Sequence, residues 1–125
     1  MKDLIYKQEC YQIQGAVFEV YKEMGNGFLE AVYQECLERE LDSRDMPYIS
    51  KKSIPLHYKR NKLLKTYRPD LICYGKIIVE IKSVSVISKE HQAQVLNYLK
   101  STRLKLGLIM NFGAYPKVEI KRLLI

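Results

Sequence analysis

The chain has no tryptophan, only three cysteines and no long hydrophobic run. Cys10, Cys36 and Cys73 are odd in number and widely spaced, and none belongs to a Cys-x-x-Cys pair or a Cys/His cluster, which argues against a disulfide scaffold and structural zinc. No apolar run approaches the ~20 residues of a membrane-spanning helix, and Met1–Ile5 lacks the apolar core of a signal peptide. These absences predict a soluble, cytoplasmic protein with no membrane partner.

Acidic residues are also scarce: 14 stand against 21 lysines and arginines, which gives a net charge of +7. Such a balance favours an anionic partner, and nucleic acid is the partner we expect. A solvated basic surface without function is the competing interpretation. The basic residues gather in four groups, at 51–52, 59–68, 100–105 and 117–122.

The length of 125 residues and the 47% hydrophobic content predict one domain, 1–125, with a real core. Apolar spacing near 3.6 residues predicts helices over 8–23, 28–43 and 88–102. Alternating or continuous apolar runs predict strands over 48–58, 66–74, 76–82, 104–112 and 118–125. The order α-α-β-β-β-α-β-β predicts an α/β fold with a mixed central β-sheet flanked by helices, because a helical crossover makes the strands on either side of it parallel. The last strand fits either a core position or an edge used in dimerisation.

The most informative feature is a pair of carboxylates that one turn would bring together. Tyr74-Gly75-Lys76 separates two strands, and glycine supplies the positive φ that a tight turn needs. If these three residues form the loop, Asp70 lies directly opposite Glu80, with Cβ atoms ~5 Å apart. Lys82 shares that face because side chains repeat every two residues. A two-residue loop would instead place Asp70 and Glu80 on opposite faces.

Glu80 and Lys82 interrupt an otherwise apolar strand, and buried charges persist when they are paired, hydrogen-bonded or bound to metal. The spacing is equally compatible with two interpretations. In one, the strand end reaches solvent and Glu80 pairs with Lys82 or Lys65. In the other, the carboxylates hold Mg²⁺, which accepts one or two carboxylates together with water and phosphate oxygens.

Two helical faces could complete such a site. Glu30 and Tyr33 share a face of the second predicted helix, although a glutamate in a first turn is also favoured simply by the helix dipole. His91, Gln94 and Tyr98 form a polar line along the third predicted helix, beside its apolar stripe. His91 lacks a second histidine or cysteine at ligand spacing, so we expect a surface or capping role for it.

Five motifs occur in order along the chain: Gly27–Tyr33 (Gly-x-x-Glu-x-x-Tyr), Arg68–Asp70, Ile78–Lys82, His91–Leu99 and Leu108–Gly113. With these motifs the chain resembles the GxxExxY protein family, which is placed in the PD-(D/E)XK nuclease-like superfamily. The resemblance runs from about Gly15 to the C-terminus and implies a restriction-endonuclease-like core.

By position, the resemblance implies that Asp70, Glu80 and the backbone carbonyl of Ile81 are metal ligands. It also implies that Lys82 is the catalytic lysine and Glu30 a supporting acidic residue. Residues assigned to substrate binding are Gln94 and Tyr98, which match a Gln-x-x-x-Tyr motif, together with Arg68 and Tyr33.

The leading hypothesis is therefore a Mg²⁺- or Mn²⁺-dependent nuclease that hydrolyses DNA phosphodiester bonds, with basic strand and loop residues on the DNA backbone. Two other hypotheses stand beside it. One is a non-catalytic nucleic-acid-binding or assembly module that keeps the fold, and the other is a purely structural role for the acidic residues. A chain this small has little room for a substrate-reading subdomain, which favours either dependence on a partner, as in a homodimer or a complex with a larger protein, or weak specificity.

Overall fold

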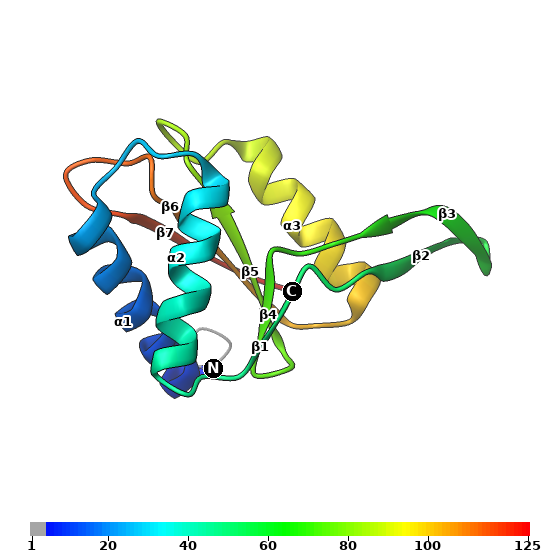
Figure 1. Ribbon diagram of the computed structural model, residues 1–125. Helices are drawn as coiled ribbons and strands as arrows, with labels where there is room; N and C mark the ends of the chain where they lie inside the picture. Colours follow the sequence, from blue (N-terminus) through cyan, green and yellow to red (C-terminus); the bar gives the residue numbers. More distant parts are fainter. Residues whose placement is uncertain (1–4) are drawn as a thin grey trace.

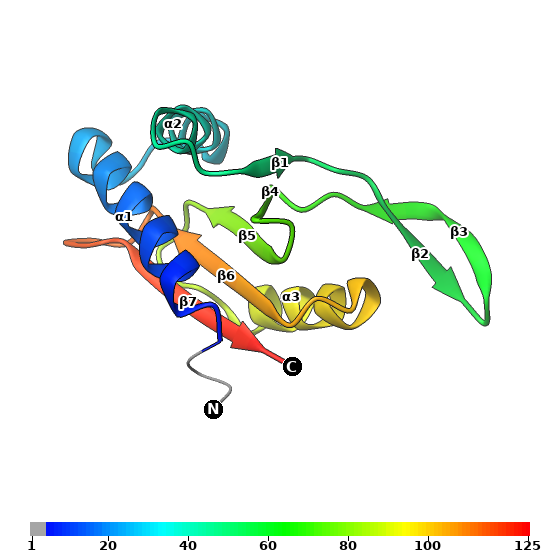
Figure 2. The ribbon, with the colours of Figure 1, turned by 90° about the horizontal axis from the view of Figure 1, so that it is seen from below.

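The structure, a computed structural model, describes residues 5–125 and has a five-stranded sheet between two layers of helices (Figure 1). Helices α1 (Lys7–Met24) and α2 (Glu30–Ser43) cover one face, and α3 (Lys89–Thr102) covers the other (Figure 2). The predicted α/β fold and the three predicted helices are confirmed. Of the N-terminal stretch Met1–Ile5, only Ile5 belongs to the described residues.

The sheet has the strand order β1-β4-β5-β6-β7. Strands β5 and β6 are parallel, as the predicted crossover through α3 requires, and the other neighbours are antiparallel. Strand β7 lies at the edge of the sheet, which places the last predicted strand there. The strands span Tyr48–Ser50 (β1), Leu71–Cys73 (β4), Ile77–Lys82 (β5), Leu106–Asn111 (β6) and Glu119–Leu124 (β7).

The central strand β5 divides the core because its side chains alternate between the two faces. Ile77, Val79 and Ile81 pack against the α1–α2 layer, whereas Ile78 packs beneath α3. Glu80 follows Ile78 on the α3 face, so it is a charged residue at the border of a buried apolar cluster.

The turn that decides the register of the two carboxylates has the predicted length. Cys73 pairs with Ile77, and the loop residues Tyr74 and Gly75 both have positive φ. At the other end of the ladder Leu71 pairs with Val79, and Asp70 and Glu80 are the next residues outward from that pair. The three-residue loop is therefore confirmed.

Two of the predicted strands are each broken in two, so residues 5–125 contain seven strands where the sequence predicted five. Residues 48–58 divide into β1 and β2 (Ile54–Tyr58), and residues 66–74 divide between β3 (Asn61–Tyr67) and β4. Strands β2 and β3 form a separate two-stranded sheet. Asp70 accordingly lies in the link before β4 and not within a strand. Pro69 explains the break, because it has no N–H to donate to a ladder.

Local chemistry defines an end of α1 and an end of α3. Gly25 caps α1 at φ 71°, a conformation that favours glycine. Ser88 caps α3 and accepts a hydrogen bond from the His91 N–H, while the His91 imidazole accepts one from the Ser88 N–H. The capping role of His91 is thus confirmed.

Among residues 5–125, no helix has the length and apolar character needed to cross a membrane. The three cysteines are free thiols, and Cys10 and Cys73 are buried. Burial raises the pKa of the Cys73 thiol to about 12.

Candidate active site

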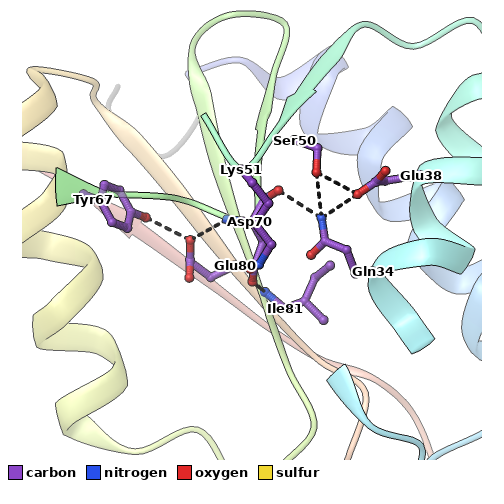
Figure 3. Close-up of polar contacts among 8 residues, drawn as sticks. All are labelled: Gln34, Glu38, Ser50, Lys51, Tyr67, Asp70, Glu80 and Ile81. Atoms are coloured by element: carbon purple, nitrogen blue, oxygen red, sulfur yellow. Dashed lines mark hydrogen bonds and ion pairs between the residues drawn. The ribbon is translucent and has the colours of Figure 1, made fainter. Parts of the chain in front are cut away.

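Asp70 and Glu80 meet where β4 begins beside β5 (Figure 3). The Asp70 backbone N–H donates to Glu80 Oε1 at 3.1 Å. In turn, the Ile81 backbone N–H donates to Asp70 Oδ2 at 2.8 Å. Glu80 is therefore fixed by the backbone of Asp70, and Asp70 by the backbone of β5, so the pair lies at one spot as the register predicted.

Asp70 is held from three directions. Its Oδ1 forms an ion pair of 2.5 Å with Lys51 Nζ. Its carbonyl oxygen accepts hydrogen bonds from the Lys51 backbone N–H at 3.2 Å and from Gln34 Nε2 at 3.0 Å. Gln34 belongs to α2, so this contact connects the helix layer to the loop that carries Asp70. The Asp70 side chain is only 16% exposed, which makes its orientation well defined.

Gln34 is itself fixed by a small polar group beside the site (Figure 3). Its amide nitrogen also donates to Glu38 Oε2 at 2.7 Å, and the Ser50 hydroxyl donates to the same carboxylate oxygen at 2.8 Å. These contacts join α2 to β1. They give the Asp70 loop a rigid support that does not depend on the carboxylates themselves.

Glu80 lies in a less polar environment than Asp70. Burial, followed by the nearby Asp70 carboxylate, raises the pKa of Glu80 to about 7, although hydrogen bonds from Tyr67 and from the Asp70 N–H oppose the shift. The Tyr67 hydroxyl donates to Glu80 Oε1 at 2.9 Å. Burial and the Glu80 carboxylate also raise the pKa of Tyr67, so the phenol remains a donor.

Tyr67 links the carboxylates to α3. Its ring stacks on Tyr98 with centroids 3.3 Å apart and an interplanar angle of 10°. Gln94 Nε2 donates to the Tyr98 hydroxyl at 3.3 Å. The predicted Gln94–Tyr98 face is thereby brought beside Glu80 through Tyr67. Glu80 is in direct contact with Tyr67, and Tyr98 contacts the Tyr67 ring.

Lys82 lies two residues beyond Glu80 in β5 and shares its face. It is half-buried, and its positive charge lowers the pKa of Glu80. Within residues 5–125 Lys82 forms no salt bridge, so the predicted pairing of Glu80 with Lys82 as a closed ion pair is absent there.

Glu30 opens α2 and lies at the carboxyl end of β5. Its Oε2 accepts a hydrogen bond from the Ser83 N–H at 3.3 Å, and the Ser83 hydroxyl donates to the Phe28 carbonyl at 2.5 Å. Ser83 is three residues beyond Glu80, which corresponds to roughly 10 Å along an extended strand. Glu30 therefore holds the end of β5 and lies apart from the carboxylate pair.

Tyr33 requires a correction. Its ring is fully buried and stacks on Phe112 with centroids 4.3 Å apart. Its hydroxyl donates to the Gly25 carbonyl at 2.5 Å and accepts from the Phe28 N–H at 3.2 Å. A side chain with both contacts used inside the α1–α2 loop shapes that loop and does not face a substrate. Arg68, in contrast, is exposed beside Asp70.

Two site residues were missed in the sequence. Tyr67 was placed only within a strand, and Lys51 was counted only as part of a basic group. The signal for Tyr67 was its position directly before Arg68-Pro69. Strand β3 ends there, and Tyr67, its last residue, reaches the site. Lys51 gave no comparable signal, because its contact with Asp70 depends on the break between β1 and β2.

The donor set fits a hard divalent cation. Two carboxylates that share a partly buried site repel each other, and Lys51 supplies the neighbouring positive charge in this structure. Mg²⁺ uses one or two carboxylates and completes its shell with water and substrate oxygens. In the described part of the chain, no three acidic, histidine or cysteine side chains are grouped closely enough to form a metal cluster. The fit therefore rests on the Asp70–Glu80 pair.

A solved structure shares the fold. The crystal structure of SSO0001 is similar to this chain, with a TM-score of 0.59 and 15% sequence identity. The similarity covers 75% of this chain and 50% of that one, so the chain spans half the length of that structure. At this identity the likeness concerns the fold alone. No curated protein matches the chain.

The family model described as the PD-(D/E)XK nuclease superfamily matches residues 7–123. That range includes every residue of the carboxylate site and nearly the whole chain. The match agrees with the mixed sheet and with the position of Asp70 directly before β4, beside Glu80-Ile81-Lys82 in the neighbouring strand β5. The chain belongs to the PD-(D/E)XK nuclease superfamily.

Proposed function

We propose that this protein is a Mg²⁺- or Mn²⁺-dependent nuclease that hydrolyses phosphodiester bonds in DNA. One observation carries the proposal: Asp70 and Glu80 are held in mutual contact at the start of β4, with Lys82 on the same face of β5. Within the superfamily, the Gly27–Tyr33 motif supports the narrower assignment to the GxxExxY proteins.

Asp70 and Glu80 would hold the cation, with the Ile81 carbonyl as a third oxygen. A divalent cation bound there supplies an activated water and stabilises the charge that develops on the phosphate. The pair suits this role because a bound cation would favour the ionised form of Glu80, whose pKa is raised first by burial and then by the nearby Asp70 carboxylate.

The surrounding side chains would position these groups. The Ile81 N–H and Gln34 fix Asp70, and the Tyr67 hydroxyl fixes Glu80. Lys82 would orient the attacking water or neutralise the developing anion. Glu30 would support the site through Ser83, at the end of β5.

Substrate contacts are proposed for the residues around this centre. Arg68 is exposed beside Asp70 and would hold a phosphate. Gln94 and Tyr98 lie on the α3 side, where Tyr98 backs the Tyr67 ring and Gln94 presents an exposed amide. The fully buried Tyr33 is left out of this set.

A second candidate is a nucleic-acid-binding or assembly module without catalysis. Its support is the occupation of Asp70, since Oδ1 pairs with Lys51 and Oδ2 accepts from the Ile81 N–H. A carboxylate satisfied by a lysine can persist as a structural ion pair after metal binding is lost.

Labelled single- and double-stranded DNA incubated with the protein and Mn²⁺ or EDTA separates the two candidates. We expect cleavage that requires the metal and falls by about 100-fold or more in Asp70→Asn and in Lys82→Ala, because each substitution removes a charge from the reacting centre. Lys117→Ala is the matched control, since Lys117 is exposed and lies before β7. Salt-sensitive binding with no cleavage under any metal would favour the module.

A further inference from the structure

The net charge of the chain resides in one segment. Residues 51–69 contain seven lysines and arginines and no acidic residue, whereas the rest of the chain contains 14 of each sign and is neutral overall. The net charge of +7 is therefore the charge of this segment alone. Its basic residues are Lys51, Lys52, Lys59, Arg60, Lys62, Lys65 and Arg68.

Most of this segment is an arm that projects from the body of the protein (Figures 1 and 2). We call residues 54–67, the β2–β3 hairpin, the arm; it forms its own two-stranded sheet. Its longer strand, β3, has seven residues and spans roughly 20 Å. All residues from Asn61 to Thr66 are exposed.

The positive charge on the arm is free to act on a partner. Of the salt bridges among residues 5–125, none involves Lys59, Arg60, Lys62 or Lys65. Closely spaced cations on a thin ribbon with no acidic neighbour repel one another, and a polyanion relieves that repulsion. A folded body covering the arm would need matching acidic charge, which the neutral remainder of this chain does not supply.

The arm starts at the candidate active site. Tyr67, the last residue of β3, donates to Glu80, and the next three residues are Arg68-Pro69-Asp70. Ile54 and Leu56 pack with the cluster under α3, which anchors the base of the arm to the body. A polymer held along the arm is thereby led to the carboxylates.

The outer part of the arm also exposes apolar side chains. Three residues of β3, Leu63 to Lys65, lie opposite the single residue Leu56 of β2, an irregularity in the ladder that turns Leu64 fully into solvent. Tyr58 is 62% exposed, with Lys59 Nζ 5.4 Å from its ring centroid. Apolar groups among cations suit a groove, where base edges and methyl groups lie between two rows of phosphates.

We propose that the arm binds duplex DNA as a two-stranded β-ribbon in the major groove, with its lysines and arginine on the flanking phosphates. The major groove of B-form DNA is wide enough for such a ribbon, whereas that of A-form RNA is too deep and narrow. This inference rests on the proposed function, and it identifies the substrate of the proposed nuclease as double-stranded DNA.

Binding of a fluorescent 20-base-pair duplex, measured by anisotropy in EDTA, tests the arm without requiring cleavage. In the variant Lys59→Gln/Arg60→Gln/Lys62→Gln/Lys65→Gln, we expect about 100-fold weaker binding at low salt. We also expect the slope of log affinity against log salt to fall by about 3 to 4, because each phosphate contact contributes nearly one unit.

The matched control removes four exposed lysines from α1, β7 and the segment before β7, elements that lie away from the arm (Figure 2): Lys7→Gln/Lys22→Gln/Lys117→Gln/Lys121→Gln. It lowers the net charge by the same amount, so we expect less than a fivefold change in affinity. An equal loss of binding in both variants would overturn the proposal, since net charge and not the arm would then decide affinity.

Competitor nucleic acids and the oligomeric state provide further ways for the proposal to fail. Tighter binding of single-stranded DNA or duplex RNA than of duplex DNA would overturn it. A dimer of the wild type in sedimentation velocity would also overturn it, if the Leu63→Gln/Leu64→Gln variant is a monomer that binds DNA as well as the wild type. The arm would then contact a second copy of the chain.

Parallel cleavage assays with Mn²⁺ keep the two proposals distinguishable. Loss of binding in the arm variant without cleavage by the wild type supports the arm and opposes the nuclease. Cleavage by the wild type, together with unchanged DNA binding by the arm variant, supports the nuclease and opposes the arm.

Discussion

At the scale of single residues, the carboxylate of Glu80 is destabilised by burial and by a neighbouring negative charge, and its hydrogen bonds compensate for this only in part. Glu80 shares its pocket with Asp70, and the hydrogen bonds from Tyr67 and the Asp70 N–H do not offset the desolvation of its carboxylate. Lys51 is half-exposed and contacts Asp70, not Glu80. An ionised Glu80 therefore opposes folding in the absence of a cation.

This destabilisation predicts how stability depends on pH. The pKa of Glu80 is about 7 in the folded protein and near 4.5 in the unfolded chain, so folding is favoured when the carboxyl is protonated. The stability from this protonation is fully present below about pH 4.5 and is lost as pH rises through 7. In Glu80→Gln, which stays neutral, we expect a free energy of unfolding higher than the wild type's by about 2 kcal/mol at pH 8 and similar to it at pH 4.5.

Urea denaturation in EDTA at several pH values measures the effect. Glu90→Gln, at an exposed position in the first turn of α3, is the control for loss of a surface carboxylate. If the free energies of Glu80→Gln and the wild type run parallel from pH 4.5 to pH 8, the burial argument for Glu80 is wrong.

Gly113 is a position where the backbone leaves no room for a side chain. A Cβ added there would lie 2.3 Å from the Val84 carbonyl oxygen and 2.5 Å from the Val84 nitrogen. The buried Asn111 holds both segments, since its Oδ1 accepts from the N–H groups of Val84 and Gly113. We expect Gly113→Ala to displace the β5–α3 link and to lower the free energy of unfolding by about 2 kcal/mol.

Gly15→Ala is the comparison for that substitution. Gly15 lies within α1, and its added Cβ would meet only the flexible end of Arg44 at 3.3 Å. We expect unchanged or slightly higher stability there, because alanine favours a helix by up to about 1 kcal/mol. Thermal unfolding of the two variants checks the contrast, and a tolerant Gly113→Ala would contradict the close approach.

At the scale of elements, the sequence predicted what depends on periodicity and local chemistry. The helices, the parallel crossover and the Tyr74-Gly75-Lys76 turn follow from spacing and from glycine, and the turn set the register of Asp70 and Glu80 correctly. The sequence did not predict that the chain leaves the main sheet near 51–53 and returns to it after Pro69. Each alternating run continues across the break, so only the choice of partner strand distinguishes β1 from β2.

The same limit explains which residues of the candidate site were placed correctly from the sequence. Asp70, Glu80 and Lys82 are fixed by one local turn and one strand period. The ion pair of Lys51 with Asp70 and the stacking of Tyr67 on Tyr98 join segments that are 19 and 31 residues apart in the chain. Such contacts depend on three-dimensional packing. Tyr33 was assigned from a motif alone, which does not distinguish a buried phenol from an exposed one.

The tip of the arm breaks a local rule. Lys59 and Arg60 both have positive φ, at 49° and 69°, as in the tight hairpin turn where Asn-Gly is preferred. We expect Lys59→Asn/Arg60→Gly to stabilise the arm by about 1 kcal/mol, because both residues tolerate this conformation. Amide exchange of residues 57–65 should then slow by roughly fivefold, since the arm opens less often.

The same substitution should weaken binding to duplex DNA by about 10-fold, because two cations are lost. Lys59→Gln/Arg60→Gln separates the two effects, since it removes the charges and keeps the strain. We expect it to match the weakened binding with no slowing of exchange. Slower exchange without loss of affinity would place the DNA contacts away from the tip.

At the scale of the whole molecule, the carboxylates lie in the body, whereas the net charge of +7 lies in residues 51–69, which comprise the arm and the residues at its base. The two parts differ in stability as well as in charge. Strands β5 and β6 are buried on both faces between helices, whereas the arm is a two-stranded ribbon, which is marginal by itself in water. Only the base of the arm, at Ile54, Leu56 and Tyr67, packs into a core cluster.

This contrast predicts where trypsin cuts the native protein first. Cleavage requires local unfolding around a lysine or arginine, and the arm opens at the lowest free energy. We therefore expect the first cuts at Lys59, Arg60, Lys62 or Lys65, detected by mass spectrometry, while the basic residues of the body remain uncut. Chymotrypsin should cut first at Tyr58, Leu63 or Leu64, which distinguishes an open backbone from a mere abundance of lysine. Duplex DNA in EDTA should slow both enzymes at the arm, and first cuts within α1 or α3 would contradict this division of the molecule.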